Sequence, residues 1–257
     1  ISWEIIENAS NRYSSGIGFF LTELLHCDSK FTALCDADDA WISNDKLEKQ
    51  LALMSSDPSI AVSHHSFTPY LQASGQFLES FSTSGSMGER DILSFLESNG
   101  IAACTVMFRN SFLRKHSDWV GYEALLVPDY PIWGVLALYG RVVHISDLES
   151  KYRILAGSFG SRLRYKELMR GTLNIRRWLW SQYARSGIVS MDNLDRVWRD
   201  ICQDYAFSWE FGGLNLRRFL TWRILYPTLG YFQLSKIWQA QSVAQKVRRR
   251  LKPGFRK

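Results

Sequence analysis

The chain has 257 residues, of which 46% are hydrophobic and 22% charged, and its 10 Trp, 11 Tyr and 15 Phe residues exclude a disordered protein. It has no run of about eighteen uncharged apolar residues, so we expect no transmembrane helix. It lacks the basic start of a signal peptide, and its cysteines lack CxxC spacing. We therefore expect a cytoplasmic protein without a zinc site or a disulfide framework. The net charge of +6 is uneven: residues 1–150 carry 9 Lys+Arg against 19 Asp+Glu, and residues 151–257 carry 22 against 6.

Strands and helices are expected to alternate along the first 160 residues. The hydrophobic patterns predict strands at 1–7, 31–35, 59–67, 105–108, 142–145 and 149–155, and helices at 19–27, 46–54, 91–96 and 129–139. The apolar run 31–35 is typical of a buried parallel strand. The helix 46–54 has Leu47, Leu51 and Met54 on one face, and the Ser- and Gly-rich residues 70–88 are expected to form a surface loop.

After residue 160 the pattern becomes purely helical. Four helices are expected, at 161–186, 191–208, 213–226 and 231–251. We therefore expect an α/β domain over residues 1–160 and a basic, Trp-rich helical extension over residues 161–257.

The acidic tetrapeptide Asp36-Ala37-Asp38-Asp39 follows the apolar run directly. Its carboxylates repel one another unless a cation or hydrogen-bond donors compensate. The carboxyl ends of strands in open α/β sheets are where ligands bind, and residues two apart on a strand point to one side, so Asp36 and Asp38 can converge. Hard oxygen ligands suit Mg²⁺ or Mn²⁺. The alternative is a solvated turn ahead of the next helix.

Residues 31–50, which continue through Trp41 and Lys-Leu-Glu-Lys-Gln, resemble the metal-binding segment of family 2 glycosyltransferases with the GT-A fold. Bacterial members show an apolar strand, then D-A-D-D-x-W, then K-L-x-K-Q. Further segments resemble the family in the expected order: 99–109 ends in Arg109, 128–140 places an acid before a helix and a Gly, and 151–155 contains Tyr152-Arg153. The resemblance implies a GT-A-like, Rossmann-like mixed and mainly parallel sheet with flanking helices.

The resemblance also implies an inverting, metal-dependent sugar transfer from a nucleotide-diphosphate donor, with a UDP-sugar expected, to a glycan or lipid-linked acceptor in bacterial surface-polysaccharide assembly. Asp38 would be the principal ligand of Mn²⁺ or Mg²⁺, and Asp36 would assist it or contact the ribose. Asp39 would support or contact the donor sugar. The metal would act as a Lewis acid toward the leaving diphosphate.

Asp129 matches the family's general base, which deprotonates the acceptor hydroxyl. Taken alone, an acid just before a helical run is more often a helix N-cap, and the order of the motifs is what favours the base. Tyr152 and Arg153 would contact the donor diphosphate, and Arg109 would contact ligand or form a surface ion pair. Relatives often carry a His shortly after the Tyr-Arg pair, whereas this chain has Leu155.

The sequence departs from the family at its start, because the expected strand, turn and helix of the nucleotide pocket do not precede Ile1. We therefore expect an N-terminally incomplete catalytic domain with little activity by itself. The alternatives are a non-catalytic, membrane-associated module that retains the fold and, less favoured, an acidic-site phosphotransferase or nuclease. The basic helices are expected to lie on an anionic membrane, at the inner face of the plasma membrane, or to pack on the catalytic domain. Nucleic-acid binding is disfavoured because no recognition motif accompanies the charge.

Overall fold

The computed structural model describes residues 17–79, 89–155 and 165–207. The chain forms two compact units, Ile1–Val189 and Ser190–Lys257. The helices of the first unit are α1 (Gly18–His26), α2 (Lys46–Ser56), α3 (Ser94–Glu97), α4 (Asn110–Lys115), α5 (Asp129–Leu136) and α7 (Tyr165–Ser186), with short 3-10 helices η2 (Ala103–Thr105) and η3 (Tyr122–Ala124). Its strands are β1 (Phe31–Ala33), β2 (Ala40–Trp41), β3 (Ile60–Leu71), β4 (Gln76–Phe77), β5 (Met107–Arg109) and β6 (Arg141–Ile154). The second unit contains α8 (Met191–Phe207).

Most elements expected from the sequence are confirmed, with shifted ends. The helices expected at 19–27, 46–54, 129–139, 161–186 and 191–208 correspond to α1, α2, α5, α7 and α8. The strand expected at 1–7 and the helices expected at 213–226 and 231–251 lie outside the described residues. None of the helices in the described part of the chain combines the length and apolar character that a membrane crossing requires.

The sheet is mixed, and the expectation of a mainly parallel sheet is wrong. Its order is β1-β5-β3-β6-β2, with β4 paired to β3. Among the strands that the structure describes, only β3 and β6 run parallel; β1 and β2 each pair antiparallel with a neighbour. The apolar run 31–35 suggested a strand buried on both faces, yet β1 is only half-buried. A short apolar run fits either arrangement, because strand direction depends on the connections and not on local composition.

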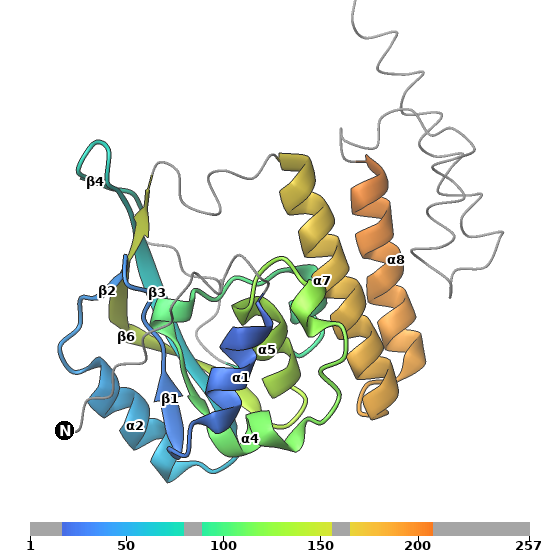
Figure 1. Ribbon diagram of the computed structural model, residues 1–257, viewed down its shortest axis with the longest axis horizontal. Coiled ribbons are helices and arrows are strands. Elements are labelled where there is room, and N and C mark those ends of the chain that lie inside the picture. The colour runs from blue at the N-terminus through green and yellow to red at the C-terminus, as the bar shows by residue number, and fades with distance from the viewer. Residues whose placement is uncertain (1–16, 80–88, 156–164, 208–257) are drawn as a thin grey trace, which may run out of the picture. The chain divides into compact units, whose positions relative to one another are not determined.

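β3 and β6 are longer than the sequence suggested. The two strands expected at 142–145 and 149–155 form the single strand β6, which follows β3 along its whole length through a register shift at His65/Ser66. Beyond this shift, residues 66–71, residues 149–154 and β4 form a projection that we call the arm (Figure 1). The loop expected at 70–88 is therefore partly β-structure, since β3 continues to Leu71 and pairs with β4; residues 80–88 lie outside the described part.

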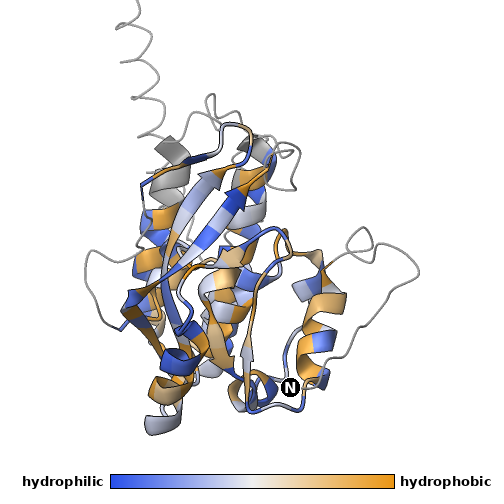
Figure 2. Cartoon of the chain, turned by 90° about the vertical axis from the view of Figure 1, so that its left-hand side faces the viewer, coloured by the Kyte–Doolittle hydropathy of each residue, from blue (hydrophilic) through white to orange (hydrophobic). Residues whose placement is uncertain are grey.

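Helices cover both faces of the sheet. α2 packs on β3 and β5, and α5 packs on the opposite face, where the rings of Phe108 and Trp133 lie 5.9 Å apart. Hydrophobic and hydrophilic residues follow one another along the strands (Figure 2), as expected for a sheet with differently packed faces.

α2 turns a different face to the sheet from the one expected. Leu47 and Leu51 are 42% and 47% exposed, whereas Lys46, Gln50 and Met54 are buried. The Gln50 amide donates to the carbonyl oxygens of Ser63 and Thr105, both at 3.1 Å. Buried carbonyl oxygens are paired with donors, and Gln50 supplies these two from the buried face of α2.

α7 is part of the first unit, although the sequence analysis placed it in the C-terminal extension. It packs against α5 at Gly134, where an added Cβ would lie 2.5 Å from Leu179. The Tyr183 hydroxyl donates to the Gly134 carbonyl at 3.0 Å. Gly171 of α7 lies equally close to Leu126, where an added Cβ would lie 2.2 Å away. These close approaches join α7 to the helical layer that carries Asp129.

Candidate functional site

The acidic tetrapeptide forms a turn between β1 and β2. The backbone N–H of Asp39 donates to the Asp36 carbonyl at 2.9 Å, which closes the turn. Asp36 is exposed, while Asp38 and Asp39 are half-buried. Desolvation of its carboxyl raises the pKa of Asp36, and the neighbouring Asp38 raises it further. The turn therefore concentrates negative charge that the surrounding residues do not fully compensate.

Asp39 is the anchored member of the cluster. Its Oδ1 accepts a hydrogen bond from the backbone N–H of Arg153 in β6 at 2.8 Å, and the Cys104 thiol also contacts it. Desolvation raises the pKa of Asp39; the two donors oppose this rise, and Asp36 and Asp38 add to it. Asp39 thus ties the turn to β6. Asp36 and Asp38 make no side-chain hydrogen bond to the residues that the structure describes.

A buried polar network supports the turn from the α2 side. Trp41 donates through Nε1 to the Cys104 carbonyl at 3.0 Å, and the Lys46 ammonium lies 4.6 Å from the centre of the Trp41 ring. Lys46 is only 1% exposed and donates to Gln50 at 2.6 Å. Burial lowers the pKa of Lys46 to about 8. A second donor reaches the Cys104 carbonyl, from the Ser150 hydroxyl at 3.1 Å.

Lys46 and Gln50 were not expected to support this site. Their spacing was the available signal, because residues four apart lie on one helix face and both belong to the K-L-x-K-Q segment.

Asp129 begins α5. Its Oδ1 accepts the backbone N–H of Tyr130 at 2.8 Å, and the Asn99 side chain also contacts it. Burial raises the pKa of Asp129 to about 6; the hydrogen bonds from the backbone and from Asn99 oppose the rise, and Asp36 adds to it. A carboxylate with a pKa near neutrality is suited to accept a proton at physiological pH. The effect of Asp36 places the acidic turn near Asp129.

Tyr152 of β6 joins the same group of side chains. It is 40% exposed. Burial of its hydroxyl raises the pKa of Tyr152, and Asp39, Asp129 and Asp36 raise it further. Tyr152 is therefore close enough to the acidic turn and to Asp129 for their charges to act on its hydroxyl.

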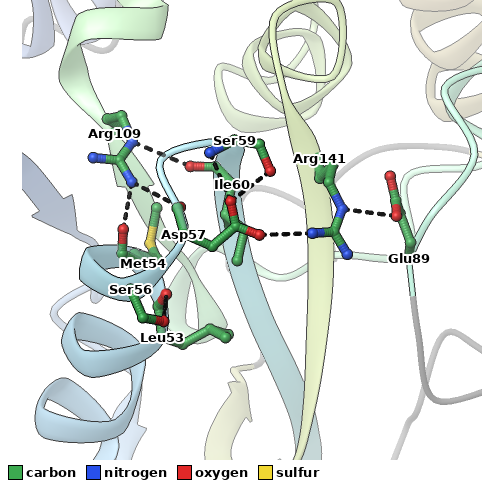
Figure 3. A network of polar contacts seen from close by, with 9 residues as sticks. All are labelled: Leu53, Met54, Ser56, Asp57, Ser59, Ile60, Glu89, Arg109 and Arg141. Carbon is green, nitrogen blue, oxygen red and sulfur yellow. Dashed lines mark hydrogen bonds and ion pairs between the residues drawn. The ribbon is translucent and has the colours of Figure 1, made fainter.

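Arg109 lies at the opposite end of β1 from the acidic turn. The register pairs Arg109 with Phe31, whereas the turn begins just after Ala33. Arg109 is 7% exposed and donates to the carbonyl oxygens of Ile60 at 3.2 Å, Asp57 at 3.2 Å and Met54 (Figure 3). It joins the end of α2 to β3. We expected Arg109 either to contact a bound ligand or to form a surface ion pair. Its buried position, with its guanidinium donating to backbone carbonyls, agrees with neither.

The ion pair in this region belongs to another arginine. Arg141 bridges the carboxylates of Asp57 and Glu89 at 2.7 and 2.8 Å (Figure 3). Arg153 contributes to the acidic site only its backbone N–H in the described contacts. Alternation along β6 puts its side chain on the other face from Tyr152.

The oxygen donors near the turn fit a divalent cation only in part. Among residues 17–79, 89–155 and 165–207, no group of three or more His, Cys, Asp or Glu side chains could hold a metal ion. A Mg²⁺-type site, however, needs one or two carboxylates when substrate phosphates supply further oxygens. Neighbouring carboxylates contribute to the raised pKa values of Asp36 and Asp39. A bound cation would lower these pKa values again.

Comparison with solved structures agrees with the fold described above. The chain is similar to the Staphylococcus aureus TarS 1-349 crystal structure in complex with UDP-GlcNAc, with a TM-score of 0.54 and 14% sequence identity. The match covers 79% of this chain and 58% of the TarS chain, so this chain spans little more than half of that structure. No protein-family model and no curated protein matches the sequence. The chain thus has a mixed α/β fold resembling the GT-A type of TarS.

Proposed function

We propose that this protein is a nucleotide-sugar glycosyltransferase that transfers a sugar, with inversion, to a hydroxyl of a glycan or lipid-linked acceptor. The observation that carries the proposal is the grouping of the acidic turn with Asp129, whose pKa is raised to about 6. An acidic turn for a metal-bound diphosphate together with a carboxylate base suits a displacement at an anomeric carbon. The GT-A-type fold supports this class of reaction as an analogy.

Each acidic side chain has a separate part in this proposal. Asp36 and Asp38 would hold Mg²⁺ or Mn²⁺, whose charge offsets the charge developing on the leaving nucleoside diphosphate. Asp39, held by the Arg153 backbone, fixes the position of the turn.

Asp129 accepts the proton of the acceptor hydroxyl, and the oxygen then attacks the anomeric carbon from the face opposite the leaving diphosphate. The bond to the diphosphate breaks as the new glycosidic bond forms, and the configuration inverts. The N–H of Tyr130 keeps Asp129 oriented, since it already binds Oδ1. A pKa near 6 leaves most of Asp129 ionised at neutral pH.

The donor site is tested by thermal unfolding of the protein produced from its whole gene. UDP-GlcNAc with MnCl₂ should raise the melting temperature, because a ligand at about 100 times its Kd stabilises the folded state by about 2.7 kcal/mol. Asp38→Ala should abolish the rise. Asp57→Ala is the matched control, since Asp57 lies at the other end of the sheet in the Arg141 network and should leave the rise unchanged.

A second measurement separates binding from chemistry. Asp129→Asn should keep the rise in melting temperature with UDP-GlcNAc and lose turnover of the donor. If Asp38→Ala responds to the donor as the unmodified protein does, the assignment of the acidic turn fails.

A further inference from the structure

The arm carries two aromatic pairs, one on each of its faces. Phe67 of β3 and Tyr152 of β6 have ring centroids 5.4 Å apart. Tyr70 of β3 and Phe77 of β4 have ring centroids 4.8 Å apart. Phe67 and Tyr70 are three residues apart on a strand without a register shift between them, so their side chains point to opposite faces. The arm thus offers an internal comparison between two similar aromatic surfaces.

The Phe67–Tyr152 face continues directly into the acidic site. Ser150, two residues before Tyr152 and on the same face, donates to the Cys104 carbonyl beside the acidic turn. The next residue after Tyr152 donates its backbone N–H to Asp39. Tyr152 is 40% exposed and Ile154, on the same face, is 37% exposed. An accessible apolar and aromatic strip therefore leads to the acidic turn at Asp39, and the charge of Asp129 also acts on the Tyr152 hydroxyl.

The other face has different surroundings. The Lys151 ammonium lies 5.2 Å from the Tyr70 ring centre, and the Thr68 hydroxyl donates to Glu149 at 2.6 Å. The side chains of these residues make no described contact with Asp36, Asp38 or Asp39, although the Lys151 backbone pairs with Ala40 next to the turn.

The chemistry of the Phe67–Tyr152 face selects among ligands. An aromatic face attracts the C–H face of a sugar ring, and carboxylates accept hydrogen bonds from its hydroxyl groups. A phosphate or an acidic sugar would instead meet the negative charge of Asp36, Asp39 and Asp129 at the inner end of the strip. A neutral polyhydroxylated ring is thus the best match to a surface with an aromatic floor and an acidic end.

We propose that Phe67 and Tyr152 form a stacking platform for a neutral pyranose ring of the acceptor, which directs one of its hydroxyls toward Asp129. This inference rests on the proposed function and names the chemical class of the acceptor. Tyr152 supplies the exposed ring, and Phe67 holds that ring in place. Both are specificity-determining residues, because they position the acceptor and take no part in proton transfer.

The test uses a printed array of neutral and acidic oligosaccharides, probed with the full chain in the presence of UDP and MnCl₂. The unmodified protein should bind neutral glycans. Tyr152→Ala and Phe67→Ala should weaken this binding at least about tenfold, the equivalent of 1.4 kcal/mol. Tyr152→Phe, which keeps the ring, should retain most of it. Tyr70→Ala and Phe77→Ala remove the matched pair on the other face and should leave binding unchanged.

The outcomes distinguish this inference from the proposed function. The platform is refuted if no neutral glycan binds the unmodified protein, if the Tyr70 and Phe77 variants lose binding equally, or if only acidic glycans bind. A loss of the UDP-GlcNAc thermal shift in Tyr152→Ala, with glycan binding intact, would assign the platform to the nucleotide instead and also refute it. If UDP-GlcNAc does not stabilise the protein while Tyr152-dependent glycan binding persists, the proposed function fails and the platform stands.

Discussion

Replacement of Asp129 by Asn should make the protein more stable at neutral pH. The folded structure raises the pKa of this carboxyl from 3.8 to about 6, chiefly by burial, and therefore disfavours its ionised form. A shift of this size corresponds to about 3 kcal/mol at most, since one pKa unit is about 1.4 kcal/mol. Asn is nearly isosteric, and its Oδ1 can still accept the Tyr130 N–H now bound at 2.8 Å.

The sign follows from linkage between protonation and folding. Because the folded pKa lies above the unfolded one, the protonated carboxyl favours folding below about pH 4, and this contribution is lost as the pH rises through about 6. The Asn variant has no such loss. Its free energy of unfolding should therefore exceed that of the unmodified protein at pH 8 by up to about 3 kcal/mol, with the difference vanishing near pH 3.5.

Urea denaturation at several pH values measures this difference. Asp57→Asn is a control for which the change in the free energy of unfolding should have the opposite sign. Hydrogen bonds from Ser59 and the nearby Arg141 lower the pKa of Asp57, so its removal should destabilise the protein at neutral pH and have less effect in acid. If Asp129→Asn is no more stable than the unmodified protein at pH 8, the carboxyl is solvated and the argument for a base with a raised pKa is refuted. A gain in stability together with a loss of donor turnover is the combination expected of a catalytic group.

Two further substitutions test the packing around the site. Gly134→Ala should destabilise the protein by about 1–3 kcal/mol, because the new Cβ would lie 2.5 Å from Leu179 of α7; urea denaturation measures this, and unchanged stability would contradict the close α5–α7 contact. Lys46→Met should remove a buried cation whose pKa is lowered from 10.5 to about 8. Relative to this variant, the unmodified protein should gain stability as the pH rises from about 8 to 10.5, because only the unfolded state still binds the proton there. Parallel stability curves over this range would contradict the buried position of Lys46.

The acidic residues were predictable from the sequence because their signal is local. Three aspartates within four residues directly after an apolar run are unfavourable without compensation, and an acid ahead of a helical pattern marks Asp129. Their order along the chain suggested a common site. The structure places the turn near Asp129, as the influence of Asp36 on the pKa of Asp129 indicates.

The remaining features depend on contacts between residues far apart in the chain. The direction of β1 is determined by its pairing with β5, about 75 residues later. Arg109 ends a strand, as expected, but its buried guanidinium donates to three backbone carbonyls at the end of α2 and the start of β3. Hydrophobic periodicity assigned Leu47 and Leu51 to the buried face of α2, yet Gln50 lies there and donates to the carbonyls of Ser63 and Thr105. Hydrophobic periodicity predicts which apolar side chains are buried, but it does not show where a buried carbonyl oxygen needs a side-chain hydrogen-bond donor.

The contacts around the acidic turn divide its residues into two groups. Trp41 and Ser150 both donate to the Cys104 carbonyl, so one peptide oxygen joins β2, η2 and β6. Asp39 adds a second connection to β6 through the Arg153 N–H. The fold therefore fixes both ends of the turn, while Asp36 and Asp38 make no side-chain hydrogen bond within the described part of the chain. These hydrogen bonds hold the turn in position and leave the carboxylates of Asp36 and Asp38 available to a ligand. We therefore assign ligand contact to Asp36 and Asp38 and a structural part to Asp39.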